Sequence, residues 1–356
     1  MFVSRENIPE PDEQNPAIEA GQTAFAPTPE TFAGLPVARL EFVLRAEERA
    51  ELPNFLGSTL RGAFGYALKR AVCVMERRDC ETCPVVDRCL YPYLFETPPP
   101  PDLPQLRSQQ QMPHPFIFEP PHTLPDRHRQ AIKRGEELGF GLILIGKAIE
   151  AAPYVIYAID EMAYGGLGAG RGRFTLTEIH WFTAQDATLP AYSAADHRLV
   201  APPNGTMDLN DYLQKRLTGF HSIPRLRLRF LTPTRIRIQG DVQTAMSFDL
   251  LLGNLWRRLL LLQTLHGAQP IEPARLDKLW WRFETGVQCA RNELRFWDWE
   301  RHSNRQQRKV KLGGFIGEVE YEGEKLAEYL PLILAGELLH VGGGTGFGLG
   351  RYQIIN

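Results

Sequence analysis

Gly342-Gly343-Gly344-Thr345-Gly346-Phe347-Gly348-Leu349-Gly350 lies near the C-terminus, and six of its nine residues are glycine. A helix-like run at 326–340 precedes it, and a short apolar strand at 352–355 follows. Glycine permits backbone conformations and close approaches that a Cβ forbids. The N–H groups of such a loop can point at a phosphate, so we expect Gly344, Gly346, Gly348 and Gly350 to contact nucleic acid. The alternative is a flexible turn that binds no ligand.

A second stretch of the same kind is Gly165-Gly166-Leu167-Gly168-Ala169-Gly170-Arg171-Gly172-Arg173. It too follows a helix-like run (148–164) and precedes a strand-like run (174–181). Elements further upstream also correspond between the two halves: strands at 138–146 and 314–321, helices at 55–72 and 248–266, and strands at 38–44 and 225–231. The chain is therefore interpreted as one α+β unit built twice. We expect domains at 36–219 and 220–356.

Bulk composition is that of an ordinary globular protein: 356 residues, 43% apolar, 23% charged, with a net charge of −2. No run of eighteen apolar residues is present, so no membrane span is expected. Residues 1–35 are rich in Pro, Glu and Ala and predict a disordered tail. They lack the basic and apolar regions of a signal peptide, so a cytoplasmic location is expected. Residues 98–125 hold ten prolines and predict a long irregular connection.

Four cysteines, at 73, 80, 83 and 89, fall within seventeen residues. The two-residue gap between Cys80 and Cys83 lets both thiolates face one metal. In a cytoplasmic protein such a cluster argues against disulfides. We therefore expect Cys73, Cys80, Cys83 and Cys89 to bind structural zinc or an iron–sulfur cluster, the alternative being incidental thiols. Cys289 stands apart and is expected in the core.

The strand expected from residue 225 alternates arginine with apolar residues. Because a strand has period two, Arg225, Arg227 and Arg229 share one face and Leu226, Leu228 and Phe230 the other. Three guanidinium groups on one face suit an RNA backbone, since arginine binds phosphate with two prongs. The alternative is a solvated face neutralised by acidic residues of neighbouring strands.

A basic segment with interleaved aromatics spans 291–311, and its part 301–311 contains no acid. Neutralising charge together with stacking rings is what unpaired nucleotides need. The residues expected to contact RNA here are Arg301, Arg308 and Lys311. His302, Arg305 and Lys309 lie in the same part and are candidates for chemistry, because the pKa of histidine lies near neutral pH.

The duplicated unit, with each half closing in a glycine loop and a strand, resembles the RAMP superfamily of CRISPR proteins. More narrowly, residues 301–321, the run 338–342 and the glycines 346–350 resemble the CRISPR-associated endoribonucleases that cut repeat RNA into guide units. The closer likeness covers residues 220–356. The resemblance implies two tandem ferredoxin-like (RRM-like, βαββαβ) domains, with the cysteine cluster and the proline-rich connection inserted in the first. It also implies repeat RNA, guide RNA and CRISPR effector subunits as partners.

The resemblance further implies metal-independent chemistry, in which the RNA 2′-hydroxyl attacks the adjacent phosphorus and leaves a 2′,3′-cyclic phosphate. No cofactor is expected for catalysis. Many family members carry a histidine on or near the first helix, and the helix at 55–72 has none. His302 is therefore the first candidate for acid–base work, with Arg305 and Lys309 beside it. Arg61, Tyr66 and Lys69 of that helix are candidates for alignment and electrostatic stabilisation.

Two other functions remain open from the sequence. One is a non-catalytic RAMP subunit that binds guide RNA within an effector complex. The other is a metal-cluster protein for which the RAMP fold is only a scaffold.

Overall fold

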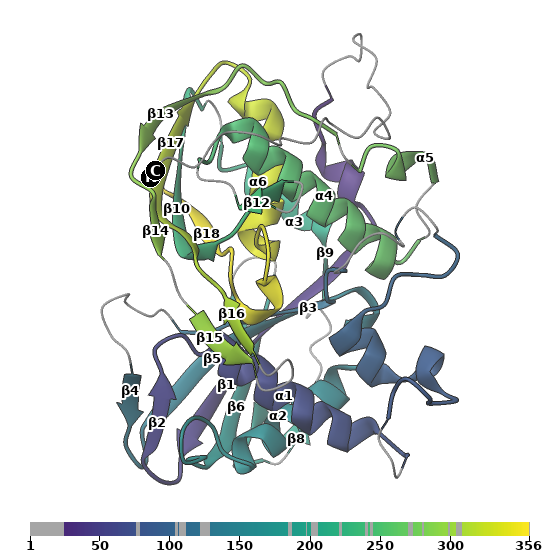
Figure 1. Cartoon of the computed structure of the whole chain (residues 1–356), viewed down its shortest axis with the longest axis vertical. Coiled ribbons are helices and arrows are strands. Elements are labelled where there is room, and N and C mark those ends of the chain that lie inside the picture. Colours follow the sequence, from purple (N-terminus) through teal and green to yellow (C-terminus); the bar gives the residue numbers. More distant parts are fainter. Residues whose placement is uncertain are drawn as a thin grey trace, which may run out of the picture.

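The computed structural model places two domains one above the other, with the C-terminal domain above the N-terminal domain in Figure 1. Among its described helices, none has the length and apolar character that crossing a bilayer requires. The structure describes residues 25–75, 79–103, 106, 112–121, 129–183, 187–196, 198–200, 206–220, 223–238, 241–242, 245–269, 273–279, 281–297, 300–303 and 308–355.

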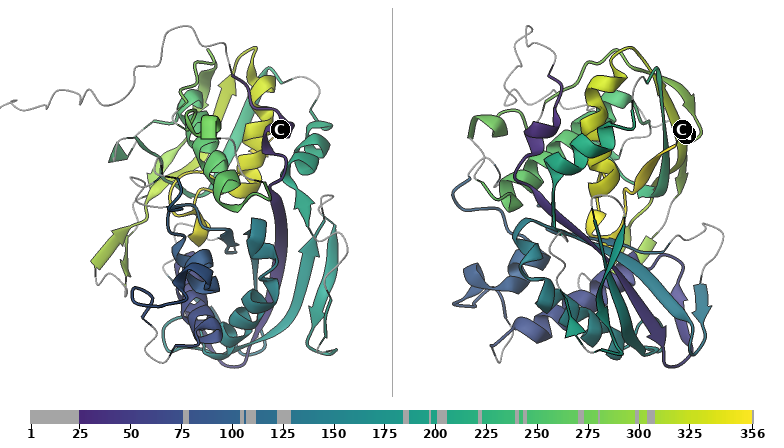
Figure 2. Two further views of the ribbon diagram at one scale, coloured as in Figure 1. Left: turned by 90° about the vertical axis from the view of Figure 1, so that its right-hand side faces the viewer. Right: turned by 180° about the vertical axis from the view of Figure 1, so that it is seen from behind.

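The N-terminal domain is a seven-stranded antiparallel sheet with two helices on one face (Figure 2). Its central strands follow the order β3-β5-β1-β6. The elements of this unit are β1 (Pro36–Ala46), α1 (Gly57–Val72), β3 (Phe116–Glu119), β5 (Glu137–Ile145), α2 (Ala152–Tyr164) and β6 (Phe174–Phe182). Additional strands are β7 (Thr188–Ser193), β8 (Arg198–Leu199), β9 (Met207–Asp208) and a separate pair, β2 (Ala50–Pro53) with β4 (Arg129–Ile132).

The C-terminal domain repeats this plan, with strand order β13-β17-β10-β18 and β14 also paired to β17. Its elements are β10 (Arg225–Thr234), α4 (Phe248–His266), β13 (Gln288–Asn292), β14 (Arg295–Trp297), β17 (Gly314–Glu322), α6 (Leu330–Leu339) and β18 (Tyr352–Ile355). Smaller elements are β11 (Arg237–Ile238), β12 (Asp241–Val242), α5 (Pro273–Leu276), β15 (Glu300–Ser303) and β16 (Arg308–Lys311). In both halves the first strand lies between the last and the third, so the prediction of two tandem ferredoxin-like domains is confirmed.

Helix α4 shows how local sequence determines these elements. Ser247 caps its N-terminus by accepting a hydrogen bond from the Leu250 N–H at 3.3 Å. Leu251, Leu255 and Leu259 recur every four residues and are fully buried. They join the apolar residues of α6 in the core of the C-terminal domain, while a second cluster fills the N-terminal domain.

Three expectations about the first half need correction. The connection at 98–125 is not irregular throughout, because β3 lies in it and pairs with β5. The tail prediction is wrong for residues 25–35, where Phe25 packs edge-on against Trp256 and Phe32 is fully buried; residues 1–24 lie outside the described part of the chain. Helix α3 (Leu209–Leu217) precedes the expected boundary at 220, yet its apolar residues join the C-terminal core.

Candidate functional site

The C-terminal glycine loop, 342–350, is packed against the N-terminal domain on two sides. A Cβ on Gly57, the first residue of α1, would lie 1.7 Å from the Phe347 carbonyl oxygen. A Cβ on Gly348 would lie 2.5 Å from the Phe118 carbonyl oxygen and 2.4 Å from Pro120 Cδ. Such distances leave no room for a side chain, so glycine is required for the backbones to approach. The loop therefore forms the junction between the domains.

Many amide groups of this loop are already used within the fold. The Gly343 N–H donates to the Arg235 carbonyl at 2.9 Å, and the Gly350 N–H donates to the Pro233 carbonyl at 3.1 Å. Within the loop, Phe347 and Gly348 donate to carbonyls three residues earlier, and Leu349 donates to Gly344. The glycines thus give the loop its shape first. Contact of Gly344, Gly346, Gly348 and Gly350 with RNA remains a prediction.

Arg61 of α1 is a cation that faces the loop. Its guanidinium carbon lies 4.1 Å from the ring centroid of Phe95 and 4.7 Å from that of Phe347. A Cβ on Gly346 would come within 3.6 Å of its Nε. Two aromatic faces hold the guanidinium in place by cation–π attraction, and Nη2 also donates to the Phe95 carbonyl at 3.5 Å. A partly exposed, oriented positive charge therefore lies where the two domains meet.

His114 supports Arg61 from the N-terminal domain. Arg61 Nη2 lies 3.0 Å from His114 Nε2, and His114 Nδ1 lies 2.9 Å from Thr97 Oγ1. Since the guanidinium can only donate, Nε2 accepts and the proton is on Nδ1, which donates to Thr97. Burial, with the Arg61 charge adding to it, lowers the pKa of His114 to about 3. The imidazole is neutral at neutral pH, so it positions Arg61 and is a poor proton donor.

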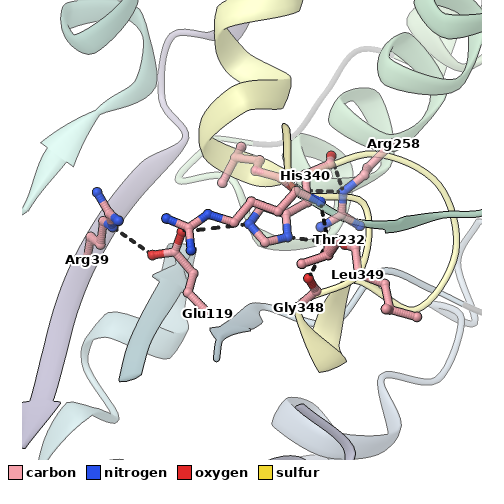
Figure 3. A network of polar contacts seen from close by, with 9 residues as sticks. Arg39, Glu119, Thr232, Arg258, His340, Gly348 and Leu349 are labelled. Carbon is pink, nitrogen blue, oxygen red and sulfur yellow. Dashed lines mark hydrogen bonds and ion pairs between the residues drawn. The ribbon is translucent and has the colours of Figure 1, made fainter. Parts of the chain in front are cut away.

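A buried ionic cluster ties the loop to β3 (Figure 3). Glu119 accepts from Arg39 Nε at 2.7 Å and pairs with Arg351 Nε at 3.3 Å, while His340 Nε2 lies 3.8 Å away. Burial alone would raise the pKa of Glu119, but His340 and the two guanidinium groups outweigh it and lower the pKa to about 2. Glu119 is therefore ionised in the folded protein over the whole ordinary pH range.

Arg258 adds a second buried charge behind the loop. Its Nε donates to the carbonyls of Leu339 and His340, at 2.9 and 3.1 Å, where α6 ends. A cation there complements the negative end of the helix dipole. Burial lowers the pKa of Arg258 to about 9, which leaves it protonated at neutral pH. His340 Nδ1 in turn contacts the Leu349 carbonyl at 3.1 Å, so the end of α6 and the glycine loop are held as one unit.

The basic segment forms the hairpin β15–β16, which extends away from the body beside the junction (Figure 2, left). His302 lies opposite Lys309 in the hairpin register, and Arg301 lies opposite Val310. The structure thus places the backbones of His302 and Lys309 side by side, whereas Arg305 lies outside the described residues. At the hairpin base, Leu312 packs with Phe55 and Leu349. The backbones of Arg308 and Lys311 belong to β16 of the same hairpin.

Tyr66 and Lys69 are not brought to the loop. Tyr66 is 67% exposed, and the Arg70 guanidinium lies 5.9 Å from its ring centroid. Lys69 Nζ lies 5.2 Å from the Tyr91 ring centroid and lines a hollow near the C-terminal end of α1. Arg61, the third candidate on this helix, is the one that reaches the junction.

The arginine face of β10 is paired with a glutamate face of β17. Arg229 Nη2 lies 2.7 Å from Glu318 Oε1, and Arg227 also pairs with Glu318, at 2.5 Å. Arg225 pairs at 3.2 Å with both Glu320 and Glu322. The neutralised outer face, the alternative weighed from the sequence, is what the structure contains. RNA contact by these arginines remains a prediction, and it would require them to leave their carboxylate partners.

The four clustered cysteines are free, half-buried thiols that line one hollow. Among the described residues, no three His, Cys, Asp or Glu side chains are grouped so that they could hold a metal ion. The expected site for one metal ion is therefore not formed as predicted. Cys289 is exposed on β13, so its placement in the core was wrong.

Comparison with known proteins matches residues 228–352 to the family model of the CRISPR-associated endoribonuclease Cas6. Residues 228–352 therefore form a Cas6-type domain. A model described as an N-terminal domain matches residues 35–204. An uncharacterized protein of Archaeoglobus fulgidus is 25% identical over 310 residues, covering 85% of this chain and 92% of its own.

Solved structures share the fold. A Cas6 product complex, of a Thermus thermophilus protein, superimposes with a TM-score of 0.51 at 18% identity and covers 91% of this chain and all of its own. A partial Cas6-RT-Cas1–Cas2 complex has a TM-score of 0.54 at 12% identity, covering 91% of this chain and 46% of that one. The Cas6 family match contains the glycine loop and the hairpin, whereas Arg61 and His114 lie in the part matched by the N-terminal model.

Proposed function

We propose that the protein is an endoribonuclease that binds CRISPR repeat RNA and cuts precursor transcripts into guide RNAs without a metal ion. The family match supports the substrate class. The observation that carries the proposal is the fixed guanidinium of Arg61 at the junction of α1 and the glycine loop. The protein would act with repeat RNA and with other CRISPR proteins as partners, as the Cas6-RT-Cas1–Cas2 complex illustrates for a relative.

The reaction needs charge stabilisation more than it needs a cofactor. The 2′-oxygen attacks the adjacent phosphorus, the bond to the 5′-oxygen breaks, and the products are a 2′,3′-cyclic phosphate and a 5′-hydroxyl. Negative charge grows on the non-bridging oxygens as the phosphorus becomes five-coordinate. A guanidinium held in advance by two rings and by neutral His114 stabilises that charge without reorganising.

The remaining tasks are gripping the RNA and moving protons. The hairpin β15–β16 carries Arg301, Arg308, Lys309 and Lys311, which we assign to the RNA backbone. We assign proton transfer to the leaving 5′-oxygen to His302, since the ordinary pKa of histidine lies near neutral pH. His114 is unsuited to that task because its pKa is about 3.

A non-catalytic RNA-binding subunit is the second candidate. The low pKa of His114 favours it, because this histidine contacts Arg61 and yet does not supply a proton at neutral pH. Both candidate functions predict binding of repeat RNA, so only an assay for RNA cleavage distinguishes them.

The test is to incubate labelled repeat RNA with the protein in excess EDTA. The proposed endoribonuclease function predicts a single cut that leaves a 2′,3′-cyclic phosphate on the upstream product. It also predicts no cut in an RNA that carries a single 2′-deoxy nucleotide at the cleavage position. Tight binding of the repeat with no cleavage in EDTA or in added divalent metal would establish the subunit instead. Cleavage only with metal would show that the activity exists but that its mechanism is different.

A further inference from the structure

A hollow near the C-terminal end of α1 collects every cysteine of the 73–89 cluster. It is lined by Lys69, Cys73, Asp79, Cys80, Cys83, Val86, Cys89, Tyr91 and Pro92. The four thiols come from the end of α1 and from the turns that follow it. The spacing of the cysteines in the sequence does not by itself place all four at one hollow, so this placement is a result of the fold.

The donor set of this hollow is all sulfur. Asp79 is occupied by the turn itself, since its carboxylate accepts from the Glu81 N–H at 3.1 Å and from the Thr82 hydroxyl at 2.9 Å. Lys69 makes a side-chain hydrogen bond to Cys80 and so brings a positive charge to the thiols. Four thiolates beside a cation suit an iron–sulfur centre, which carries net negative charge.

In the part of the chain that the structure describes, no three His, Cys, Asp or Glu side chains are grouped so that they could hold a single metal ion. Four thiolates around one zinc lie about 3.8 Å from one another, because each Zn–S bond is about 2.3 Å and the geometry is tetrahedral. In an iron–sulfur cluster the four cysteines are shared among two or more iron atoms, so they surround a larger body than one ion. Such a cluster accounts for four cysteines that line one hollow without forming a site for a single ion.

The same segment supports Arg61. After Cys89, Tyr91 stacks on Phe95 of the π-helical segment Pro92–Glu96, with ring centroids 5.4 Å apart. Phe95 lies under the Arg61 guanidinium, and a Cβ on Gly65 of α1 would be 2.3 Å from its ring. Thr97, the next residue but one, holds His114. Whatever fixes the cysteines therefore fixes the floor of the Arg61 site.

We propose that Cys73, Cys80, Cys83 and Cys89 bind an iron–sulfur cluster that anchors residues 79–97 to α1. The cluster is structural: all four ligands come from the protein, and Lys69 covers it. Its role is to hold the π-helical segment in place under Arg61.

The experiment is anaerobic reconstitution of the full chain with ferrous iron, sulfide and a thiol reductant, read out by visible absorption and by iron, sulfide and zinc content. We expect a broad visible chromophore with iron and sulfide in equal amounts. The Cys80→Ser, Cys83→Ser double variant should lose both, and Cys289→Ser, which removes the exposed cysteine of β13, should keep both. Trypsin cleavage after the exposed Arg88, between two of the ligands, should be slower in the reconstituted protein than in the apoprotein.

Three results would overturn the proposal: no chromophore after reconstitution, zinc in place of iron, or a chromophore retained by the double variant. Far-UV circular dichroism checks that the double variant is folded, and Cys89→Ser serves as a milder second variant. Cluster content is measured without RNA, so this result stands or falls independently of the cleavage assay.

Discussion

The two glycine-rich loops have similar compositions, but they contact different parts of the molecule. The first, at 165–172, packs within its own domain: a Cβ on Gly168 would lie 2.2 Å from the Glu51 carbonyl oxygen, and one on Gly172 would lie 2.6 Å from Ala50 Cβ. Both neighbours belong to β2. Within the described residues, these two close approaches of the first loop stay inside its own domain.

The second loop performs the same closure and also meets the other domain. Gly346 leaves room for Arg61 and His114, and Gly348 allows the backbone to touch β3. A buried ionic cluster around Glu119 reinforces that contact, whereas the ion pairs near the first loop, such as Arg49–Glu51, are exposed. The two domains thus contain similar loops, and the candidate site lies at the second loop, which contacts helix α1 of the other domain.

The largest expected effect is on chemistry at the second loop. Arg61→Ala should slow single-turnover cleavage of repeat RNA by about 100-fold or more, because it removes a preorganised charge from the transition state. The matched control is Arg70→Ala, which removes an exposed arginine from the same helix and should change the rate by less than about two-fold. Equal cleavage rates for both variants would show that catalysis does not depend on Arg61 at the domain junction.

Next in size is the stability cost of filling the loops. Gly348 and Gly170 have almost the same φ, +86° and +87°, so an alanine costs each about 1–2 kcal/mol in backbone strain. Only at Gly348 would the new Cβ also strike other backbone, while nothing lies within 4 Å at Gly170. We expect urea denaturation to give a loss of about 3 kcal/mol or more for Gly348→Ala and about 1–2 kcal/mol for Gly170→Ala. Equal losses would show that the second loop does not join the domains.

The smallest effect is a pH dependence that arises from two buried histidines, His114 beside Arg61 and His266 at the end of α4. Burial lowers the pKa of His114 to about 3 and that of His266 to about 4. Below about pH 6.5 these histidines are protonated in the unfolded chain but remain neutral in the folded chain. Lowering the pH therefore lowers the free energy of unfolding. The slope approaches about 1.4 kcal/mol per pH unit for each histidine. Glu119, whose pKa is lowered to about 2, adds its own loss only below about pH 4.5.

Urea denaturation between about pH 7 and pH 5 measures this slope. The His114→Gln variant lacks one of the two buried histidines, so its free energy of unfolding should fall less steeply with decreasing pH than that of the parent. A slope that is the same in the variant and the parent would mean that His114 is not held neutral beside Arg61.

The sequence predicted the repeated elements well because their signals are local. Helix α4 has the bounds expected from its apolar spacing, 248–266, and α1 and β17 differ from expectation by two residues or fewer. The second strand of each unit was missed. β3 has an apolar sequence but is only four residues long and lies among prolines, whereas β13 is exposed along its length and has no buried face. Both strands are defined by their pairing with β5 and β17.

The site was harder to predict because it is assembled from distant segments. His114 is 53 residues from Arg61 and lies in the proline-rich stretch, so no spacing connects them. The arginine face of β10 was a different case. Glu318, Glu320 and Glu322 alternate in the strand that pairs with it, and that period-two pattern was a readable sign of neutralisation.

Hydrogen exchange tests the central comparison most directly. The full chain is measured alone and with repeat RNA that carries a 2′-deoxy nucleotide at the cut position, so that the complex persists. Slower exchange on RNA binding is expected in 342–350 and at the start of α1, with no change in 165–172. Protection of the first loop, or none at the second, would contradict the account.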